Sequence, residues 1–166
     1  LVKVERFSMD AELAPFLSGE ALIFDMRIEE PVARIRLLQD GTLDWMRGSQ
    51  ADIPARSVVL ENVHITGGQI DFIDEQSGRT RRISDLNAEM SAKSLAGPWR
   101  VEGSAALDGE KGAFSLTSTQ PDEIRNAMRL KTRIVPNGRA LSVDLDGELK
   151  IVDSKPSYQG AFTAAS

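Results

Sequence analysis

The chain has 166 residues, of which 41% are hydrophobic and 27% charged, so it is long enough to form one domain with its own core. Its net charge of −5 argues against nucleic acid as a partner, because phosphate binding needs a basic surface. The sequence contains no cysteine and a single histidine, His64, which excludes disulfides and cysteine-based zinc sites; we expect neither a metal nor a cofactor.

We interpret residues 1–166 as a single domain with two subregions, residues 1–48 and residues 55–166. No stretch approaches the roughly 20 apolar residues that a membrane-spanning helix needs. The sequence opens at Leu1 in a strand-like pattern, without a methionine. We therefore expect it to be a segment of a longer protein whose membrane anchor lies outside it.

The first subregion is expected to combine strands with a short helix. The acidic start and apolar spacing of residues 10–17 predict one or two helical turns, which Gly19 ends. Glu30-Pro31 separates two predicted strands, and Asp40-Gly41 is typical of a hairpin turn. The strands expected in this subregion are residues 1–9, 21–28 and 32–38.

The second subregion is predicted to be a meander of hairpins, because apolar and polar residues alternate between turn residues. Its expected strands are residues 57–66, 69–74, 79–93, 100–107, 113–118, 130–135, 141–152 and 158–164. Gly67-Gly68 is expected to turn the first of these hairpins. Residues 119–128 predict a second short helix, since Pro121 suits a first helical turn. Gly147 lies within an unbroken alternation, which indicates a bulge, a bend or a close approach on the inner face rather than a turn.

The predicted fold class is mainly β: a curved antiparallel sheet of successive hairpins with one or two short helices. Residues 141–151 give the clearest pattern, with leucine, valine and isoleucine on one face and serine and charged residues on the other. Two short helices are too small to cover so many strands, which indicates an open groove. A sheet that rolls up into a barrel or packs on a second sheet would cover its own apolar face instead.

Enzyme signatures are largely absent: the sequence has no GxSxG, P-loop or GxGxxG motif, and we predict that the protein is not an enzyme.

His64 is interpreted as a solvent-facing strand residue. Asp71 and Asp74 form the best candidate for a carboxylate site, but the arginines at 79, 81 and 82 favour cross-strand charge pairing. Asp144, Asp146 and Glu148 are interpreted as a solvated acidic stripe. Trp45 and Trp99 each follow a turn and are expected to plug an end of the sheet.

Several motifs, taken in order, resemble the AsmA family. The first is FSMDAELAPFLSGEALI at residues 7–23, followed by DGTLDW at residues 40–45, in which Asp44 replaces the usual asparagine. GGQIDFID at residues 67–74 then resembles the Gly-Gly hairpin of the family. The remaining matching segments are Ser77-Gly78, residues 83–87, residues 94–98 and Tyr158-Gln159-Gly160.

The resemblance implies a context and a function. AsmA-like proteins, with the related TamB-like proteins, are regarded as repeating β-grooves, taco-shaped sheets with a hydrophobic interior. One N-terminal helix anchors them in the bacterial inner membrane, and their bulk lies in the periplasm. They are implicated in moving phospholipids toward the outer membrane and in its biogenesis. The resemblance therefore implies a periplasmic domain whose partners are phospholipid acyl chains, a membrane reached through the anchor, and other envelope proteins.

If the sheet binds lipid, acyl chains are expected to lie along aliphatic inner positions, with small residues at Gly103, Gly112, Gly147 and Gly160 leaving room. No chemistry is needed, because the apolar wall replaces water around the chains. The candidate groove residues are Val101, Ala105, Leu107, Phe114, Leu116, Leu141, Val143, Leu145, Leu149 and Ile151.

The alternative is a structural or interaction module without lipid. Its sheet would close over a filled core, and its edge strands would recruit envelope proteins by strand pairing. The extent of exposed apolar surface separates these two hypotheses.

Overall fold

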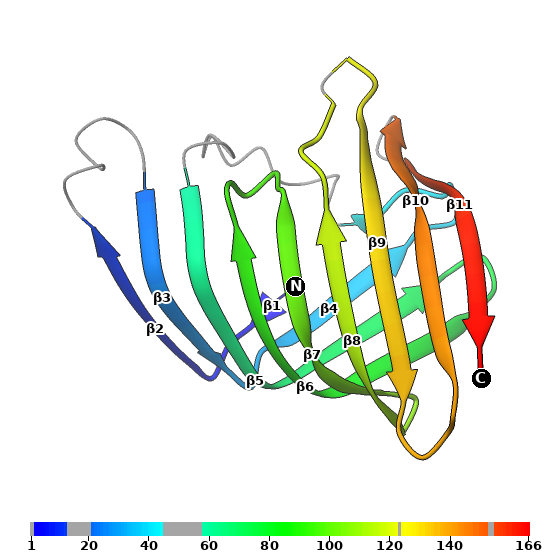
Figure 1. The fold of residues 1–166 in the computed structure, drawn as a ribbon, viewed down its shortest axis with the longest axis horizontal. Coiled ribbons are helices and arrows are strands. Elements are labelled where there is room, and N and C mark those ends of the chain that lie inside the picture. Colours follow the sequence, from blue (N-terminus) through cyan, green and yellow to red (C-terminus); the bar gives the residue numbers. More distant parts are fainter. Residues whose placement is uncertain (1, 13–20, 45–57, 123, 153–154) are drawn as a thin grey trace.

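The computed structural model describes residues 2–12, 21–44, 58–122, 124–152 and 155–166, which form one curved, open sheet of 11 strands (Figure 1). The predicted fold class, mainly β with a curved and largely antiparallel sheet, is confirmed. The strands are β1 (Val2–Lys3), β2 (Arg6–Glu12), β3 (Ala21–Glu29), β4 (Val32–Leu37), β5 (Val58–Asp74), β6 (Arg79–Ala92), β7 (Trp99–Leu107), β8 (Glu110–Ser118), β9 (Ala127–Pro136), β10 (Ser142–Val152) and β11 (Lys155–Ala165).

From β5 to β11 the chain is a meander in which each strand pairs with the next one in antiparallel orientation. The strands before β5 are arranged differently, because β3 and β4 lie end to end along β5 and both run parallel to it. β2 pairs with β3, and the short β1 pairs with β4. Figure 1 shows β2 and β11 at opposite edges of the sheet.

The predicted turn at Gly67-Gly68 is wrong, because β5 runs through both glycines as one strand of 17 residues. The two glycines lie beside Glu30-Pro31, the break between β3 and β4, where Glu30 donates its backbone N–H to the carbonyl of Thr66 (2.8 Å). Glu30, Gly67 and Asp85 all have positive φ, at 49°, 66° and 51°. Bulges on neighbouring strands bend the sheet along one line, since a bulge kinks the strand that carries it.

The predicted helix at residues 119–128 is also wrong. Asp122 accepts hydrogen bonds from the backbone N–H groups of Ile124 (3.0 Å) and Arg125 (3.1 Å), and its backbone pairs with Ala127. An aspartate that binds nearby N–H groups in this way favours a turn over a helix. Of the helix predicted at 10–17, residues 10–12 belong to β2 instead, and the rest lies outside the described residues. In the described part of the chain, no helix has the length and hydropathy to cross a membrane.

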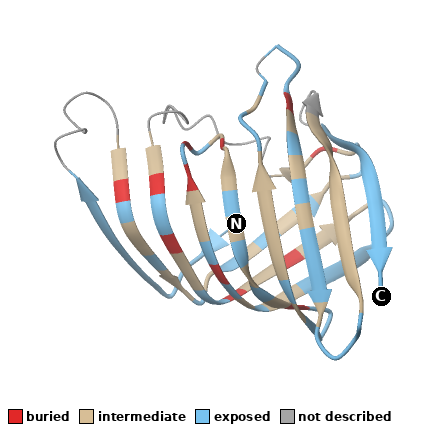
Figure 2. Cartoon of the chain, viewed as in Figure 1, coloured by how far each residue is buried: buried red, intermediate tan, exposed pale blue. Residues whose placement is uncertain are grey.

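The buried residues are few and mostly small. One cluster, Ile23, Leu60, Val63 and Ala92, lies where β3, β5 and β6 meet, and Trp99 packs against it. Trp99 also donates its indole N–H to the carbonyl of Leu95 (3.1 Å), just before β7 begins. No described side chain is less than 2% exposed. Figure 2 accordingly shows short buried segments separated by half-buried and exposed ones, so most of the apolar surface is not enclosed.

Candidate functional site

The strand register places apolar residues in long rows across one face of the sheet, because residues directly opposite each other in paired strands share a face. The first row crosses nine strands and is Phe7, Ile28, Ile65, Ala88, Gly103, Phe114, Ile134, Val143 and Ala164. The second row is Met9, Met26, Val63, Met90, Val101, Leu116, Thr132, Leu145 and Phe162. Thr132 is the single polar residue in these two rows, which together form what we call the apolar floor.

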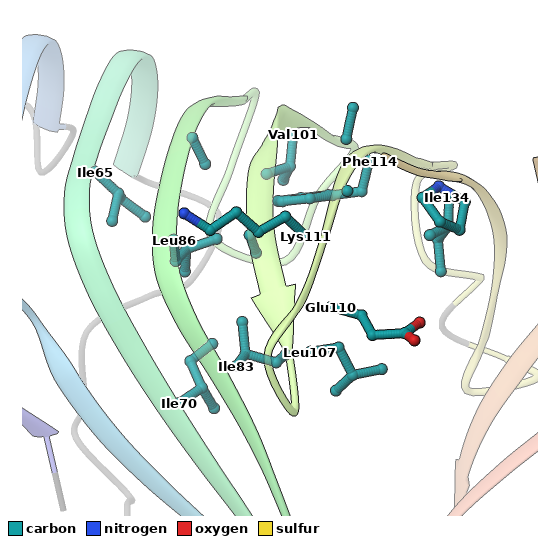
Figure 3. Close-up of a pocket in the computed structure, with 15 residues that line it drawn as sticks. Ile65, Ile70, Ile83, Leu86, Val101, Leu107, Glu110, Lys111, Phe114 and Ile134 are labelled. Atoms are coloured by element: carbon teal, nitrogen blue, oxygen red, sulfur yellow. The ribbon is translucent and has the colours of Figure 1, made fainter. Parts of the chain in front are cut away.

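A cavity of about 420 Å³ lies on this face, lined by residues of five successive strands from β5 to β9. One cavity can touch five neighbouring strands only where the sheet curves around it, so the apolar floor is the concave face. Figure 3 shows Ile70, Ile83 and Leu107 gathered at one end of the cavity, with Val101 and Phe114 at the other. Ile70, Ile83 and Leu107 are directly opposite one another on β5, β6 and β7.

Four of the ten candidate groove residues line this cavity, namely Val101, Ala105, Leu107 and Phe114. Leu116, Val143, Leu145 and Leu149 lie outside the cavity but continue the apolar floor, Leu149 opposite Met128 and Tyr158. Leu141 is half-buried and lies just before β10 begins. The backbone of Ile151 pairs with Pro156, and the side chain of Ile151 is outside the described part of the structure. Their role in ligand binding stays a prediction.

Five of the larger aliphatic residues that line the cavity were not among the candidate groove residues: Ile65, Ile70, Ile83, Leu86 and Ile134. Ile65 and Ile70 are five residues apart, and Ile83 and Leu86 three apart, yet all four face the cavity. Strict alternation assigns odd spacings to opposite faces, but a bulge between the two residues shifts the phase by one. The Gly-Gly pair in β5 was the available signal for such a bulge.

The β7–β8 hairpin contributes two charged residues to the lining, with Glu110 beside Leu107 and Lys111 reaching across toward Leu86 (Figure 3). Glu110 accepts a hydrogen bond from Arg139 (2.6 Å), and the Lys111 ammonium lies 3.5 Å from the carboxylate of Asp85. The cavity lining is therefore mostly apolar with two charged residues, which suits an amphiphile better than a uniformly apolar molecule.

The inner glycines do not simply leave room, as the sequence reasoning expected. A Cβ on Gly103 would collide with the backbone of β6, 2.8 Å from the Cα of Ala88. A Cβ on Gly147 would lie 2.6 Å from the carbonyl oxygen of Gln159 and 2.7 Å from the Tyr158 hydroxyl. Neighbouring backbone and an aromatic side chain fill this space, so these glycines permit close strand packing. The predicted close approach at Gly147 is confirmed.

The convex face carries charges that pair across strands. Arg129 on β9 binds Asp146 on β10 through two hydrogen bonds of 2.6 and 3.0 Å, and Lys131 lies 3.6 Å from the same carboxylate. Arg133 lies 3.5 Å from Asp144. The hydrogen bond from Arg129 lowers the pKa of Asp146 below its ordinary range. The acidic stripe predicted on β10 is therefore matched by a basic stripe on β9.

The carboxylates considered for catalysis have structural partners. Asp71 is 8% exposed and accepts a 2.7 Å hydrogen bond from Arg82 across β5 and β6, which lowers its pKa and confirms the predicted cross-strand pairing. Asp74 accepts hydrogen bonds from the Ser77 hydroxyl (2.6 Å) and the backbone N–H of Gln76 (2.9 Å), and thereby caps the β5–β6 turn. His64 is 41% exposed, 3.9 Å from both Asp25 and Glu89. The described residues include no cluster of three or more His, Asp or Glu that could hold a metal ion.

Together the fold and the cavity define an open β-sheet with a continuous apolar concave face and an ion-paired convex face. Comparison of the chain with family models, curated proteins and solved structures found no match.

Proposed function

We propose that this chain is a lipid-binding groove segment of an AsmA-like envelope protein, which shelters phospholipid acyl chains as they move between the inner and outer membranes. The apolar floor carries the proposal, because it crosses nine strands and remains largely uncovered. An exposed apolar surface of this extent is typical of an interaction site. Acyl chains suit it because the floor consists of aliphatic, methionine and phenylalanine side chains, with the Thr132 hydroxyl as its single hydrogen-bonding side chain.

The proposal includes a location and a mode of action. The chain would work in the bacterial periplasm, held at the inner membrane by an anchor elsewhere in the protein, with phospholipid and envelope proteins as partners. It would act without catalysis, since transfer requires only that apolar wall replace water along the chain. Asp71 and Asp74 are engaged in the sheet and its turn, in agreement with this non-enzymatic role.

The test is a carboxylate placed inside the cavity. Ala105 lines the cavity on β7, whereas its neighbour Ser104 is exposed on the convex face. Native mass spectrometry and solvent extraction of the purified protein would measure bound phospholipid. We expect Ala105→Asp to lower it about tenfold or more, because a carboxylate buried among acyl chains is unpaired.

Ser104→Asp is the matched control, since it adds the same charge on the next residue but on the other face. It should keep wild-type binding, and both variants should keep the circular dichroism of the sheet. Equal phospholipid in a folded Ala105→Asp variant would refute the groove assignment. A wild-type protein free of lipid after incubation with phospholipid vesicles would favour the structural module instead.

A further inference from the structure

The apolar lining of the cavity ends at a carboxylate beside the β7–β8 turn. Ile70, Ile83 and Leu107 lie directly opposite one another on β5, β6 and β7, and Glu110 on β8 continues this row opposite Leu107. All four residues line the cavity, and Figure 3 shows Glu110 beside Leu107. The row therefore passes directly from aliphatic side chains to a charged group.

Arg139, in the turn between β9 and β10, is held beside this carboxylate. Asn137 in the same turn donates its backbone N–H to the carbonyl of Lys111 (2.8 Å), which attaches the turn to β8. Arg139 donates a hydrogen bond of 2.6 Å from its Nη2 atom to Oε1 of Glu110. Both side chains are well exposed, Arg139 by 60% and Glu110 by 64%. A cation and an anion thus lie side by side where the cavity meets water.

The contact between the two side chains saturates neither of them. A guanidinium has five N–H donors and suits a phosphate, whereas a carboxylate has two acceptor oxygens and suits a primary ammonium. A phospholipid headgroup of the ethanolamine type carries a phosphate and a primary ammonium that are two carbon atoms apart. It therefore presents the charges complementary to this pair, and its acyl chain matches the apolar cavity that begins beside Glu110.

We propose that Glu110 and Arg139 form a headgroup subsite, in which Arg139 binds the phosphate and Glu110 the ammonium of an ethanolamine-type phospholipid. The inference rests on the proposed function, because the acyl chain in the cavity is what brings the headgroup to this pair. Two other headgroups fit less well. A choline headgroup ends in a quaternary ammonium without an N–H to donate to Glu110, and a glycerol headgroup brings a phosphate but no cation to that carboxylate.

Lys111 is the second charged residue of the lining and the competing partner for the phosphate. Its ammonium lies 3.5 Å from the carboxylate of Asp85, on β6. The phosphate and ammonium of one headgroup need neighbouring partners, and Arg139 is the cation in direct contact with Glu110. The geometry therefore favours Arg139.

Titration with four single-chain lipids that share one acyl chain tests the subsite. The lipids are lysophosphatidylethanolamine, lysophosphatidylcholine, lysophosphatidylglycerol and monoacylglycerol, and calorimetry below their micelle concentrations gives each Kd. Because the acyl chain is constant, the ratios between these Kd values report the headgroup. We expect the wild type to bind the ethanolamine lipid about fivefold or more tightly than the choline lipid or monoacylglycerol, as one charge-assisted hydrogen bond provides.

Each residue should control a different ratio. Arg139→Gln should weaken all three phospholipids and leave monoacylglycerol unchanged, because the phosphate loses its partner. Glu110→Gln should make the ethanolamine and choline lipids bind equally. Arg133→Gln is the matched control: it removes an arginine of similar exposure, 58%, whose pair with Asp144 lies on the convex face, and all ratios should stay at wild-type values. Circular dichroism would show that each variant keeps the sheet.

The outcomes separate the subsite from the groove. Equal affinity of the wild type for all four lipids would overturn the subsite and leave the groove in place, whereas no binding even of monoacylglycerol would overturn both. A loss of phospholipid affinity in Lys111→Gln but not in Arg139→Gln would overturn the assignment of the phosphate to Arg139. Binding of inorganic phosphate that Arg139→Gln abolishes, with the four lipids equal, would identify a site for a free anion instead of a headgroup.

Discussion

At the scale of single residues, the inner glycines are fixed by what surrounds their missing Cβ atoms. Gly147 and Gly160 face each other on β10 and β11, and the Tyr158 hydroxyl lies 2.7 and 2.8 Å from the positions their Cβ atoms would take. An aromatic side chain laid over a glycine restores the packing that the glycine lacks. The pair thus lets two strands approach closely and keeps the floor apolar.

Gly103 gives the sharpest prediction at this scale. Its backbone is extended, so an added methyl group would introduce no φ strain and only the collision with β6. We expect Gly103→Ala to lower the free energy of unfolding by about 1–3 kcal/mol, the usual cost of overpacking. Urea denaturation would measure the change. Ser104→Ala, on the exposed neighbour, should stay within about 0.5 kcal/mol of wild type, and equal stability of the two variants would contradict the close packing.

At the scale of elements, the bulges of β5 and β6 are tied together by one side chain. Asn87 accepts a hydrogen bond from the backbone N–H of Gly67 (3.1 Å) and donates one to the carbonyl of Asp85 (2.8 Å). Gly67 and Asp85 are the bulge residues with positive φ on these strands. Asn87 therefore couples the bends of two neighbouring strands.

Removing that side chain should loosen the bend. We expect Asn87→Ala to cost about 1–2 kcal/mol of stability, since two hydrogen bonds are lost at exposed positions where water replaces them in part. Asn87→Asp keeps the acceptor for Gly67 and loses the donor to Asp85, so its cost should be intermediate. Chemical denaturation measures both, and amide hydrogen exchange should rise first at Gly67. An alanine variant as stable as wild type would argue against the coupling.

The elements also show where sequence reasoning succeeds. Alternation predicted the strands of the meander from β7 to β11, because these strands pair with one another without a register shift. It failed at Gly67-Gly68, where the same dipeptide that makes hairpin turns makes a bulge. The difference lies in β3 and β4, which run alongside β5, and such a long-range parallel pairing leaves no local pattern.

The candidate site was predicted only in part, because alternation identifies an apolar face only where a strand carries no bulge. Val101, Ala105, Leu107 and Phe114 line the cavity as alternation suggested, since β7 and β8 pair with each other without a register shift. The cavity wall contributed by β5 and β6 was missed, because Ile70 and Ile83 lie beyond bulges that shift the alternation. Periodicity finds a face only within one unbroken register.

At the scale of the whole molecule, the two faces depend differently on solution conditions. The convex face holds two carboxylates whose pKa values are lowered, Asp71 and Asp146, by hydrogen bonds from arginines. The pKa of Asp108, in the β7–β8 turn, is lowered chiefly by the backbone N–H of Arg82. A group whose folded pKa is lowered stabilises the fold above its unfolded pKa, and this stabilisation is lost as pH falls through the folded value. The apolar floor has no such dependence.

Acid should therefore unfold the sheet through its convex face. We expect stability to be nearly constant from neutral pH to about pH 5 and to fall below the ordinary aspartate pKa of 3.8. Asp146→Asn removes one of the contributing groups, so its stability should depend less steeply on pH in that range. Thermal unfolding at a series of pH values would measure this. The same acid sensitivity in both proteins would argue against a contribution from the Arg129–Asp146 pair.

The shape of the concave face predicts how ligand affinity depends on acyl-chain length. Full burial of one methylene contributes about 0.8 kcal/mol, or about fourfold in Kd. The cavity is open on one side, so each methylene should contribute less than fourfold, and the gain per methylene should become smaller once the chain extends from the cavity onto the more exposed parts of the apolar floor. Titration with single-chain phospholipids that differ by two methylenes would measure this slope. Ala105→Asp should abolish it and Ser104→Asp should leave it unchanged, whereas affinity independent of chain length in the wild type would mean that the headgroup, not the floor, binds the lipid.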